Sequence, residues 1–415
     1  MKVVHISTSD SGGAGMAVCR LHHALLSIGI ESRMLVATKT RTESEIEKAY
    51  PSPQLLFQPH KNRLVRKVQK ILRKRGYLPT LAERVHSQLV ALNEAYPTVY
   101  YTSPVTVYDP STHPLVKDAD LVHLHWIADF VDYHSFFSGI DKPVVWTFHD
   151  ENIAFGGFHY QKDRDLNYEN FKEVEDKFCL IKRDSLACCQ NIYSIALSKM
   201  MSEFLEGLDF FAPKRSYIIH NSVDYKKYRI LNKDFSRELF NVPKNHVVFS
   251  FCANGIGDPR KGLRELIDAL ERLELTDVSL LCIGPGELPR STKVNTVCVG
   301  SVTDENVMSA LYSCSDFFVM PSFQEAFAQT PIEALACGVP VIAFPCSGTE
   351  ELITDENGVR CADFTVDSLI EGIRRAMTQH FDADTLRQDV IARFSPDVIA
   401  KQYLRVYSEA LREHE

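Results

Sequence analysis

Residues 316–344 read DFFVMPSFQEAFAQTPIEALACGVPVIAF and contain the clearest structural pattern in the chain. The apolar run 317–320 is too short to span a membrane, and a Pro-Ser break ends it. A helical stretch follows, Gly338 ends it, and a second apolar run begins. This order predicts a strand, a loop, a helix and a second strand, which is the repeating unit of a parallel α/β sheet.

Two glutamates mark this stretch as a candidate ligand site. Glu325 lies in the predicted loop or the first helical turn, and Glu333 follows it along the predicted helix. Their separation is about two helical turns, so we expect both carboxylates on one side. In α/β folds, the N–H groups at the start of such a helix bind anionic ligands. Two carboxylates beside this end are suited to holding ligand hydroxyls.

Length and composition limit the classes of protein that the chain can represent. Its 415 residues exceed what one core usually supports, so two domains are expected. A net charge of -8 argues against a nucleic-acid binder with a wholly basic surface. Eleven cysteines without metal-binding or C-x-x-C spacing predict free thiols in a reducing compartment. Without a visible signal peptide or a membrane-spanning run, we expect a cytoplasmic protein.

The first residues predict a strand, a glycine-rich turn and a helix. The apolar run 3–7 leads into the glycine-rich segment 8–15, an arrangement that brings backbone amides near a phosphate or a sugar. Gly13 and Gly15 fit the start of the dinucleotide motif G-x-G-x-x-G, but Val18 stands where its third small residue belongs. A nicotinamide or flavin cofactor is therefore not expected. A turn that serves only packing is the alternative interpretation.

Two predicted strands end in histidines. The strand at 119–124 leads to His125, and the strand at 143–148 leads to His149 and Asp150. Ligands collect at the carboxyl ends of parallel strands, so we predict a functional role for His149. A functional role and a structural role both remain open for His125.

Adjacent cations open a helix in the second half of the chain. Arg260 and Lys261 precede a predicted helix at 263–273. Cations at a helix start oppose the helix macrodipole, so we expect an anion to compensate them. A diphosphate would meet this requirement.

Residues 60–75 form a basic amphipathic segment. It carries eight Lys or Arg residues and no acid, in a chain that is acidic overall. Such a helix can lie on an anionic membrane surface. A solvated face of a packed helix is the alternative. The apolar face of the predicted helix consists of Leu64, Val65, Val68, Ile71 and Leu72.

Five motifs together resemble family 4 glycosyltransferases, including bacterial capsule, exopolysaccharide and lipopolysaccharide enzymes. Glu325 and Glu333 match the family's E-x7-E signature. The other four are similar to its R-K-G, its T-x-H-D, its first glycine turn and its P-N-G-V-D hinge, and they lie at 260–262, 147–150, 12–15 and 220–224. The likeness covers nearly the entire chain, with the motifs in the expected order.

The resemblance implies a GT-B fold, an α/β architecture of two Rossmann-like domains facing each other across a cleft. Residues 1–224 would form the acceptor-side domain and residues 225–395 the nucleotide-sugar domain. Residues 396–415 would form a last helix that crosses back to the first domain.

The resemblance also implies a retaining, metal-independent transfer from a UDP- or GDP-linked sugar to a glycan acceptor, possibly lipid-linked, in polysaccharide synthesis. No metal and no cofactor besides this co-substrate are expected, and nucleic acid is not an expected partner. The catalytic residues would be His149, under the sugar, and Glu325, which would bind the sugar. The donor-binding residues would be Gly12, Gly13, Gly15, Arg260, Lys261, Ala326, Phe327, Ala328, Gln329 and Glu333, the last holding the ribose, while His125 and Asp150 would line the acceptor site or the cleft.

The chain departs from the family pattern in three places. Residues 156–160 resemble capsule and exopolysaccharide transferases that have a cysteine nearby, but no cysteine follows here until Cys179. Many members carry an arginine where this sequence has Gly255, so phosphate stabilisation would rest more heavily on Arg260 and Lys261. His220 and Ser222 replace the proline and glycine of the hinge. The alternative functions are a GT-B-like nucleotide-sugar epimerase or phosphorylase, and an inactive glycan- or nucleotide-binding module.

Overall fold

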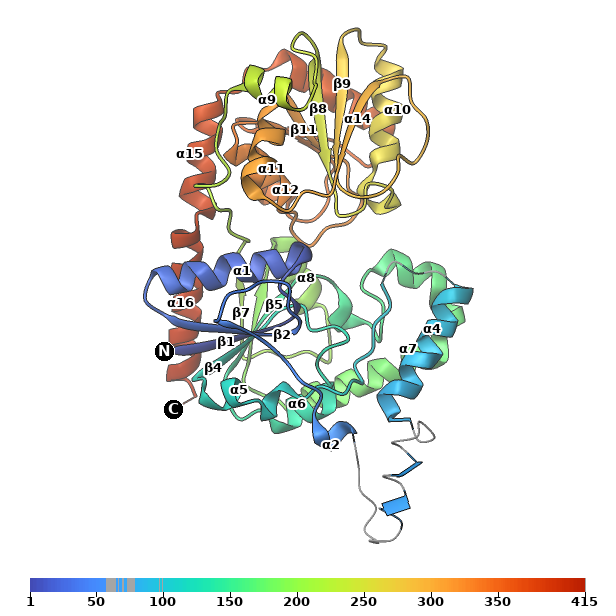
Figure 1. Cartoon of the computed structure of the whole chain (residues 1–415), viewed down its shortest axis with the longest axis vertical. Helices are drawn as coiled ribbons and strands as arrows, with labels where there is room; N and C mark the ends of the chain where they lie inside the picture. The colour runs from blue at the N-terminus through green and yellow to red at the C-terminus, as the bar shows by residue number, and fades with distance from the viewer. Residues whose placement is uncertain are drawn as a thin grey trace. The chain divides into compact units, whose positions relative to one another are not determined.

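The computed structural model describes residues 1–56, 65, 67, 68, 71, 72, 79–96, 98 and 100–414 (Figure 1). The chain divides into two compact units. Unit 1 comprises Met1–Ala196, Ser202–Tyr217 and Tyr403–Glu415, and unit 2 comprises Leu197–Met201 and Ile218–Gln402.

In its described residues, unit 1 contains a seven-stranded sheet in the order β3-β2-β1-β4-β5-β6-β7. The strands are β1 (Lys2–Ser9), β2 (Glu31–Thr38), β3 (Ile46–Lys48), β4 (Leu121–Leu124), β5 (Val144–Phe148), β6 (Ile192–Ala196) and β7 (Arg215–Ile218). The pairs from β3 through β6 are parallel. Parallel strands are covered on both faces, which explains why every residue of β4 and β5 is buried.

Helices connect these strands, because parallel strands need crossover connections. They are α1 (Gly12–Ser27), α2 (Pro53–Leu56), α4 (Leu81–Ala95), α5 (Pro114–Asp118), α6 (Tyr133–Gly139), α7 (Gln161–Ala187) and α8 (Lys199–Glu206). Short 3-10 turns lie at Pro110–Thr112 and Asn152–Ala154. The final helix α16 (Pro396–Arg412) begins in unit 2 and ends in unit 1.

Unit 2 contains, in its described residues, a six-stranded sheet in the order β10-β9-β8-β11-β12-β13. Its strands are β8 (Val247–Cys252), β9 (Val278–Ile283), β10 (Asn295–Gly300), β11 (Phe317–Met320), β12 (Val341–Ala343) and β13 (Gly358–Arg360), all in parallel pairs. Its helices are α9 (Lys233–Leu239), α10 (Leu263–Leu273), α11 (Glu305–Ser313), α12 (Thr330–Ala336), α13 (Thr349–Leu352), α14 (Val366–Thr378) and α15 (Ala383–Phe394), with a 3-10 turn at Pro259–Lys261.

Apolar clusters cover both faces of the unit 2 sheet. Leu281 and Val341 belong to one cluster, whereas their chain neighbours Leu280 and Ile342 belong to the other. Successive side chains of a strand point to opposite faces, so these adjacent pairs divide between the two cores. The sheet therefore presents its carboxyl ends, rather than its faces, to ligands.

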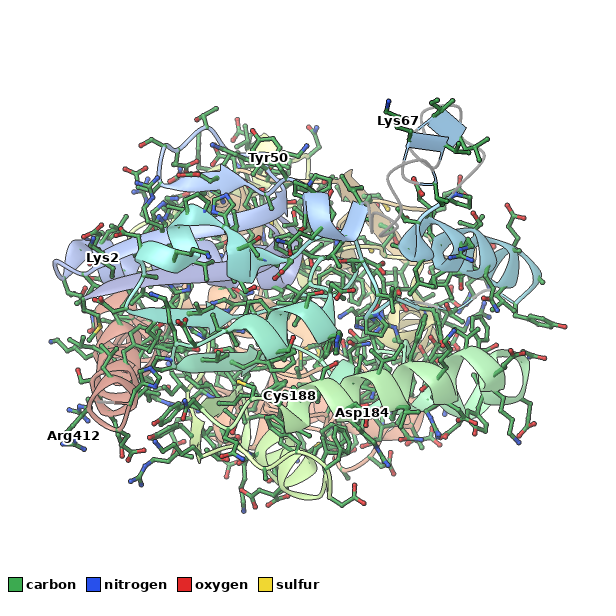
Figure 2. The ribbon with its side chains drawn as sticks, turned by 90° about the horizontal axis from the view of Figure 1, so that it is seen from below. Lys2, Tyr50, Lys67, Asp184, Cys188 and Arg412 are labelled. Atoms are coloured by element: carbon green, nitrogen blue, oxygen red, sulfur yellow. The ribbon has the colours of Figure 1, made fainter. Side chains whose placement is uncertain are left out.

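Several described helices were not predicted in full from the sequence, and three of them are long. The first, α4, begins at a capping box in which Glu83 N donates to Thr80 Oγ1 at 3.0 Å and Thr80 N donates to the Glu83 carboxylate at 2.5 Å. The T-x-x-E pattern of this box was visible in the sequence. The second, α7, begins at Gln161, within residues 156–176, where the polar and aromatic sequence predicts a loop and the start of a helix. Asp184 and Cys188 mark its end in Figure 2. The third is α15.

The division between the units differs from the predicted boundary at 224. Residues 218–224 belong to unit 2. The His220 ring stacks on Phe327 with centroids 4.8 Å apart, and Val223 N donates to the Phe394 carbonyl at 3.0 Å. The hinge motif therefore packs against unit 2, because its side chains complete the core there.

The end of α16 packs on unit 1. Tyr407 OH lies 2.7 Å from His123 Nδ1, and Tyr193 OH donates to Glu413 at 3.0 Å. The last segment of unit 1 begins at Tyr403, which is later than the predicted boundary at residue 396. None of the described helices combines the length and the apolar character that crossing a bilayer requires.

Candidate active site

The R-K-G turn and the Glu325 loop contact each other at the carboxyl end of the unit 2 sheet. Gly262 has a φ of 73°, and a Cβ on it would lie 2.0 Å from the Pro321 carbonyl oxygen. Phe323 N donates to the Arg260 carbonyl at 2.8 Å. Only glycine allows this approach, so the R-K-G motif serves packing as well as chemistry.

Each cation of this turn contacts a carboxylate of the same unit. Lys261 Nζ lies 2.5 Å from Glu325 Oε1, and their side chains are 24% and 16% exposed. Arg260 Nη2 donates to Asp258 Oδ2 at 2.7 Å. We had expected a ligand to supply the compensating negative charge, whereas the protein's own carboxylates supply it here. An anionic ligand would either replace these carboxylates as the partner of the two cations or bind the cations in addition to them.

The two glutamates are positioned by different elements. Glu325 lies in the loop before α12, and only Glu333 is helical. Our prediction that helical spacing aligns them is therefore wrong, because the helix begins after Glu325. Glu333 is 7% exposed, and its Oε2 accepts a hydrogen bond from Tyr312 OH at 3.1 Å.

Lys261 nevertheless lies in the electrostatic range of both glutamates. Burial raises the pKa of the Cys252 thiol to about 12, the charge of Glu333 adds to this effect, and the charge of Lys261 opposes it. Burial also raises the pKa of Cys346, with a further increase from Glu325 and an opposing effect of Lys261. The charge of Lys261 therefore acts on the same thiols as the charges of Glu333 and Glu325.

The segment from Ala326 to Gln329 offers a ligand its backbone more than its side chains. Phe327 is 5% exposed and belongs to the core. Ser347 Oγ donates to the Ala326 carbonyl at 3.0 Å, which fixes the start of the segment. Gln329 is the N-cap residue of α12 and Ala328 packs against the core.

The glycines after β1 divide into two kinds. A Cβ on Gly15 would lie 2.7 Å from the Ser9 carbonyl oxygen, whereas nothing lies within 4 Å of a Cβ on Gly12 or Gly13. The packing interpretation therefore holds for Gly15. Gly12 and Gly13 border open space and remain candidates for ligand approach. The helix begins at Gly12, so these glycines form its first turn rather than a separate loop.

Asp10 is a residue of this region that our sequence interpretation missed. It is fully buried, and its carboxylate accepts hydrogen bonds from Thr40 N at 2.9 Å, Thr40 Oγ1 at 2.7 Å and Arg41 N at 2.9 Å. It fixes the glycine turn to the segment that follows β2. A lone aspartate between a strand and a glycine turn does not reveal such distant partners.

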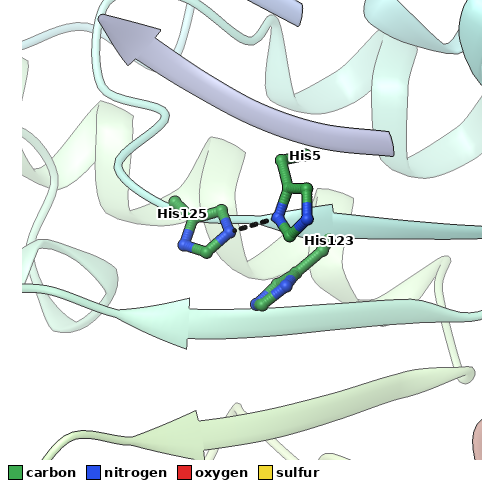
Figure 3. A group of neighbouring side chains, drawn as sticks. All are labelled: His5, His123 and His125. Atoms are coloured by element: carbon green, nitrogen blue, oxygen red, sulfur yellow. Dashed lines mark hydrogen bonds between the residues drawn. The ribbon is translucent and has the colours of Figure 1, made fainter. Parts of the chain in front are cut away.

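Four histidines meet beneath the carboxyl ends of β4 and β5. His5 Nδ1 lies 2.9 Å from His125 Nε2, and His125 Nδ1 lies 3.3 Å from His149 Nε2. The His123 ring packs against the His125 ring at a tilt, with ring centroids 3.9 Å apart. Figure 3 shows His5, His123 and His125 brought together from two neighbouring strands.

Loss of hydration keeps these imidazoles neutral. Burial lowers the pKa of His5, His123 and His125 well below the ordinary value. It also lowers the pKa of His149 to about 4, against an opposing effect of Asp150. At neutral pH the cluster therefore consists of uncharged rings that act as both donors and acceptors.

Ring nitrogens of His5, His123 and His125 lie within 4.8 Å of one another, a spacing that can suit a metal ion. The His123 nitrogens, however, lie 2.7 Å from Tyr407 OH and 2.8 Å from Thr147 Oγ1, while His5 and His125 bond to each other. We interpret the cluster as a hydrogen-bond network because every ring nitrogen of the three histidines except His5 Nε2 already has a partner among the described residues.

Asp150 and His125 are buried in unit 1, and their role at an acceptor site or a cleft stays a prediction. Asp150 is 9% exposed, and its Oδ2 accepts from Trp126 Nε1 and His159 Nδ1, each at 2.6 Å. Burial opposes ionisation of Asp150, but the charge and hydrogen bond of His159 hold its pKa below the ordinary value. His125 is 3% exposed. Of the three strand-end residues, His149 alone is partly exposed.

Lys182 is a second residue that sequence reasoning missed. It is 2% exposed and donates to the Asn152 carbonyl at 2.7 Å, the Asn152 side chain at 2.8 Å and the Phe155 carbonyl at 2.8 Å. Burial lowers its pKa to about 8. It anchors the loop after His149 from α7. A lysine in a polar helical run carries no signal of such burial.

Comparisons with known proteins agree with this architecture. The family model described as "Glycosyl transferases group 1" matches residues 247–379. An uncharacterized glycosyltransferase of Methanocaldococcus jannaschii is 28% identical over 317 residues, which are 71% of this chain and 77% of the relative. The N,N'-diacetylbacillosaminyl-diphospho-undecaprenol alpha-1,3-N-acetylgalactosaminyltransferase of Campylobacter jejuni is 24% identical over 232 residues, which are 52% of this chain and 60% of that enzyme.

A solved structure gives the fold independently. Anabaena HepE in complex with UDP and glucose has a TM-score of 0.63 at 16% identity, over 98% of this chain and 99% of HepE. The likeness inferred from the five sequence motifs is thus confirmed. Residues 247–379 match the group 1 glycosyl transferase family, in a chain with the GT-B fold of two Rossmann-like domains.

Proposed function

We propose that this chain transfers a sugar from a nucleotide-sugar donor to a glycan acceptor, with retention of configuration and without a metal ion. The observation that carries the proposal is the contact between Lys261 and Glu325 at the carboxyl edge of the unit 2 sheet. In this pair, Lys261 would supply a cation for the departing diphosphate. Glu325 would supply a carboxylate that binds the sugar from which the diphosphate departs.

Unit 2 would hold the donor. Arg260 and Lys261 would stabilise the charge that develops on the leaving diphosphate, which is the role that a divalent cation has in metal-dependent enzymes. By the family resemblance, Glu333 would hold the ribose hydroxyls and Glu325 the transferred sugar. The donor would be UDP- or GDP-linked, and HepE, which shares the fold, was solved with UDP.

Unit 1 would hold the acceptor near His149. The name of the Campylobacter relative describes an acceptor linked to diphospho-undecaprenol. We propose by analogy that this chain extends a glycan, in lipid-linked form, during synthesis of a cell-surface polysaccharide or glycoconjugate. His149 is the partly exposed residue at the strand ends that could contact the reacting sugar.

We also propose that the chain works in the cytoplasm and attaches to an anionic membrane through residues 60–75. Most of this segment lies outside the described residues. The described apolar members Val65, Val68, Ile71 and Leu72 are 40%, 54%, 55% and 36% exposed. Figure 2 labels Lys67, a basic residue of the same segment. All eleven cysteines are free thiols, as a reducing compartment favours.

Flotation with liposomes that contain anionic lipid tests the attachment. Changing Lys70, Arg73 and Lys74 to Glu should abolish flotation, because each basic residue contributes about 1 kcal/mol near such a surface. Undiminished flotation of the triple variant would remove the membrane proposal.

The transfer reaction is tested with a panel of UDP-, GDP- and ADP-sugars. Thermal shift identifies the donor that stabilises the chain, and release of nucleoside diphosphate then measures turnover. The anomeric configuration of the product, read by NMR, tests retention, and activity in excess EDTA tests metal independence.

The same panel separates the alternatives. An epimerase would convert the donor sugar without releasing the nucleotide. A phosphorylase would require free phosphate and form a sugar phosphate. Donor binding without hydrolysis or transfer to any acceptor would indicate an inactive binding module. Each of these outcomes would overturn the proposed transfer.

A further inference from the structure

A row of hydrogen-bonded imidazoles runs from the middle of β1 to the end of β5. His5 Nδ1 is 2.9 Å from His125 Nε2, and His125 Nδ1 is 3.3 Å from His149 Nε2. His5 is fully buried and His125 is 3% exposed, so the row leads from the interior to the partly exposed His149. Figure 3 shows its first bond, with His123 beside it.

Neutral rings make this row directional. A neutral imidazole has one N–H donor and one acceptor nitrogen. Burial lowers the pKa of each of the three rings, so all are neutral at pH 7. A neutral ring that accepts a hydrogen bond at one nitrogen must carry its proton on the other nitrogen. It therefore donates to the following ring from that second nitrogen. Both bonds therefore run from His5 towards His149, or both run the opposite way.

The far end of the row selects between these directions. His5 Nε2 is buried and has no hydrogen-bond partner among the residues that the structure describes. If the bonds ran towards His5, this nitrogen would carry a buried N–H without an acceptor. Orphaned N–H groups are rarer in proteins than acceptors that lack a donor. The geometry therefore favours a bare His5 Nε2 and bonds that run outward to His149.

His123 supports the row without joining it. Its ring lies 5.1 Å from that of His5 and 3.9 Å from that of His125, while its nitrogens contact Tyr407 and Thr147. It limits rotation of both rings by packing, and it has no hydrogen bond through which to set their protonation. This makes His123 a matched control for its two neighbours.

We propose that His5 and His125 are positioning residues that hold His149 in the tautomer with its proton on Nδ1. His149 then offers an N–H donor to its ligand, so the group that it binds is an acceptor such as a sugar hydroxyl oxygen or a phosphate oxygen. The ligand classes rest on the proposed function, whereas the tautomer does not. His149 is in this arrangement a hydrogen-bond donor rather than a general base.

Long-range proton–nitrogen NMR on the full chain with nitrogen-15-labelled histidine tests the proposal directly. His149 is assigned by the signal that disappears in His149→Asn. The expected wild-type pattern at pH 7.5 is a protonated Nδ1 and a bare Nε2 for both His149 and His125. If His149 of the wild-type chain is protonated on Nε2, this measurement alone overturns the proposal, and no substitution in the row is needed.

Two variants separate positioning from packing. In His125→Phe, His149 loses its partner and should shift to the Nε2-protonated tautomer, which dominates for histidine in water. We expect kcat to fall about tenfold or more, with the donor KM changed less than threefold. His123→Phe should leave the His149 pattern unchanged. Equal effects of both variants on the tautomer would also overturn the proposal.

The two proposals fail separately in these experiments. The NMR pattern is read without substrate, so the absence of sugar transfer would not alter it. A His149 protonated on Nε2 would leave the transfer reaction standing and remove only the inferred role of the imidazole row.

Discussion

The two units prepare their strand ends for ligands in opposite ways. Unit 2 places charges in contact, with Lys261 against Glu325 and Arg260 against Asp258, and these side chains remain partly exposed. Unit 1 buries neutral rings, with His5 and His125 bonded behind His149. Charge pairs can exchange partners when an anionic ligand arrives, whereas a buried neutral network fixes the orientation of one side chain. The predictions below break one arrangement or the other.

The largest effect is expected for Glu325→Ala. The substitution removes the proposed sugar ligand and leaves Lys261 without the carboxylate that it contacts. Turnover should fall by roughly 100- to 1,000-fold, the range for losing one preorganised polar contact in an active site. Nucleotide release measures this, with Glu371→Ala on the exposed side of α14 as a control. Near wild-type turnover would refute the site assignment.

The buried histidines of unit 1 should make the chain sensitive to acid. The unfolded histidine pKa is about 6.5, and the folded pKa values of His22 and His149 are lowered to about 4. The unfolded state therefore binds more protons between these values. Stability should be complete above pH 6.5 and decrease towards pH 4, with each histidine contributing up to about 1.4 kcal/mol per pH unit.

Denaturant unfolding between pH 7.5 and 4.5 measures this dependence. His123→Phe removes one group whose pKa is lowered by burial and should reduce the acid slope. His134→Gln, at an exposed position, is the control and should retain it. An unchanged slope in His123→Phe would show that the buried rings are not the source.

Lys261→Ala removes the cation of the Lys261–Glu325 charge pair. Hydrogen bonds to charged groups contribute about 1.5–3 kcal/mol, so the donor Kd should rise roughly 10- to 100-fold. Titration calorimetry with the nucleotide sugar measures the change. Arg264→Ala is the matched control, since Arg264 is an exposed cation on the next helix. Equal affinities of both variants would argue against a diphosphate contact at Lys261.

The smallest expected effect separates the two kinds of glycine after β1. Gly15→Ala places a Cβ against the Ser9 carbonyl and should lower the free energy of unfolding by about 1–3 kcal/mol. Gly13→Ala meets nothing within 4 Å and should not destabilise the chain. Chemical denaturation of the pair measures both. If the donor approaches this turn, Gly13→Ala should weaken binding without a loss of stability.

Local pattern was sufficient for most of the scaffold. The predicted helix 263–273 has the bounds of α10, because apolar periodicity and a flanking glycine act over a few residues. Where local signals were sparse, prediction was incomplete, as for α7, of which the sequence predicts only the start. Its buried residues Phe171, Val174 and Phe178 are separated by polar positions over a long, mostly exposed helix.

Motifs named the residues of the candidate site, but only the folded chain shows what each one contacts. Lys261 and Glu325 lie 64 positions apart, and His5 and His125 lie 120 apart. Spacing in sequence carries no information about contacts over such separations, since they form when distant segments enter the same sheet. The sequence alone was enough for the α/β fold, the family and the list of polar candidates. Burial decided which candidates face inward, as Asp150 and Gly15 do, and which remain available to a ligand.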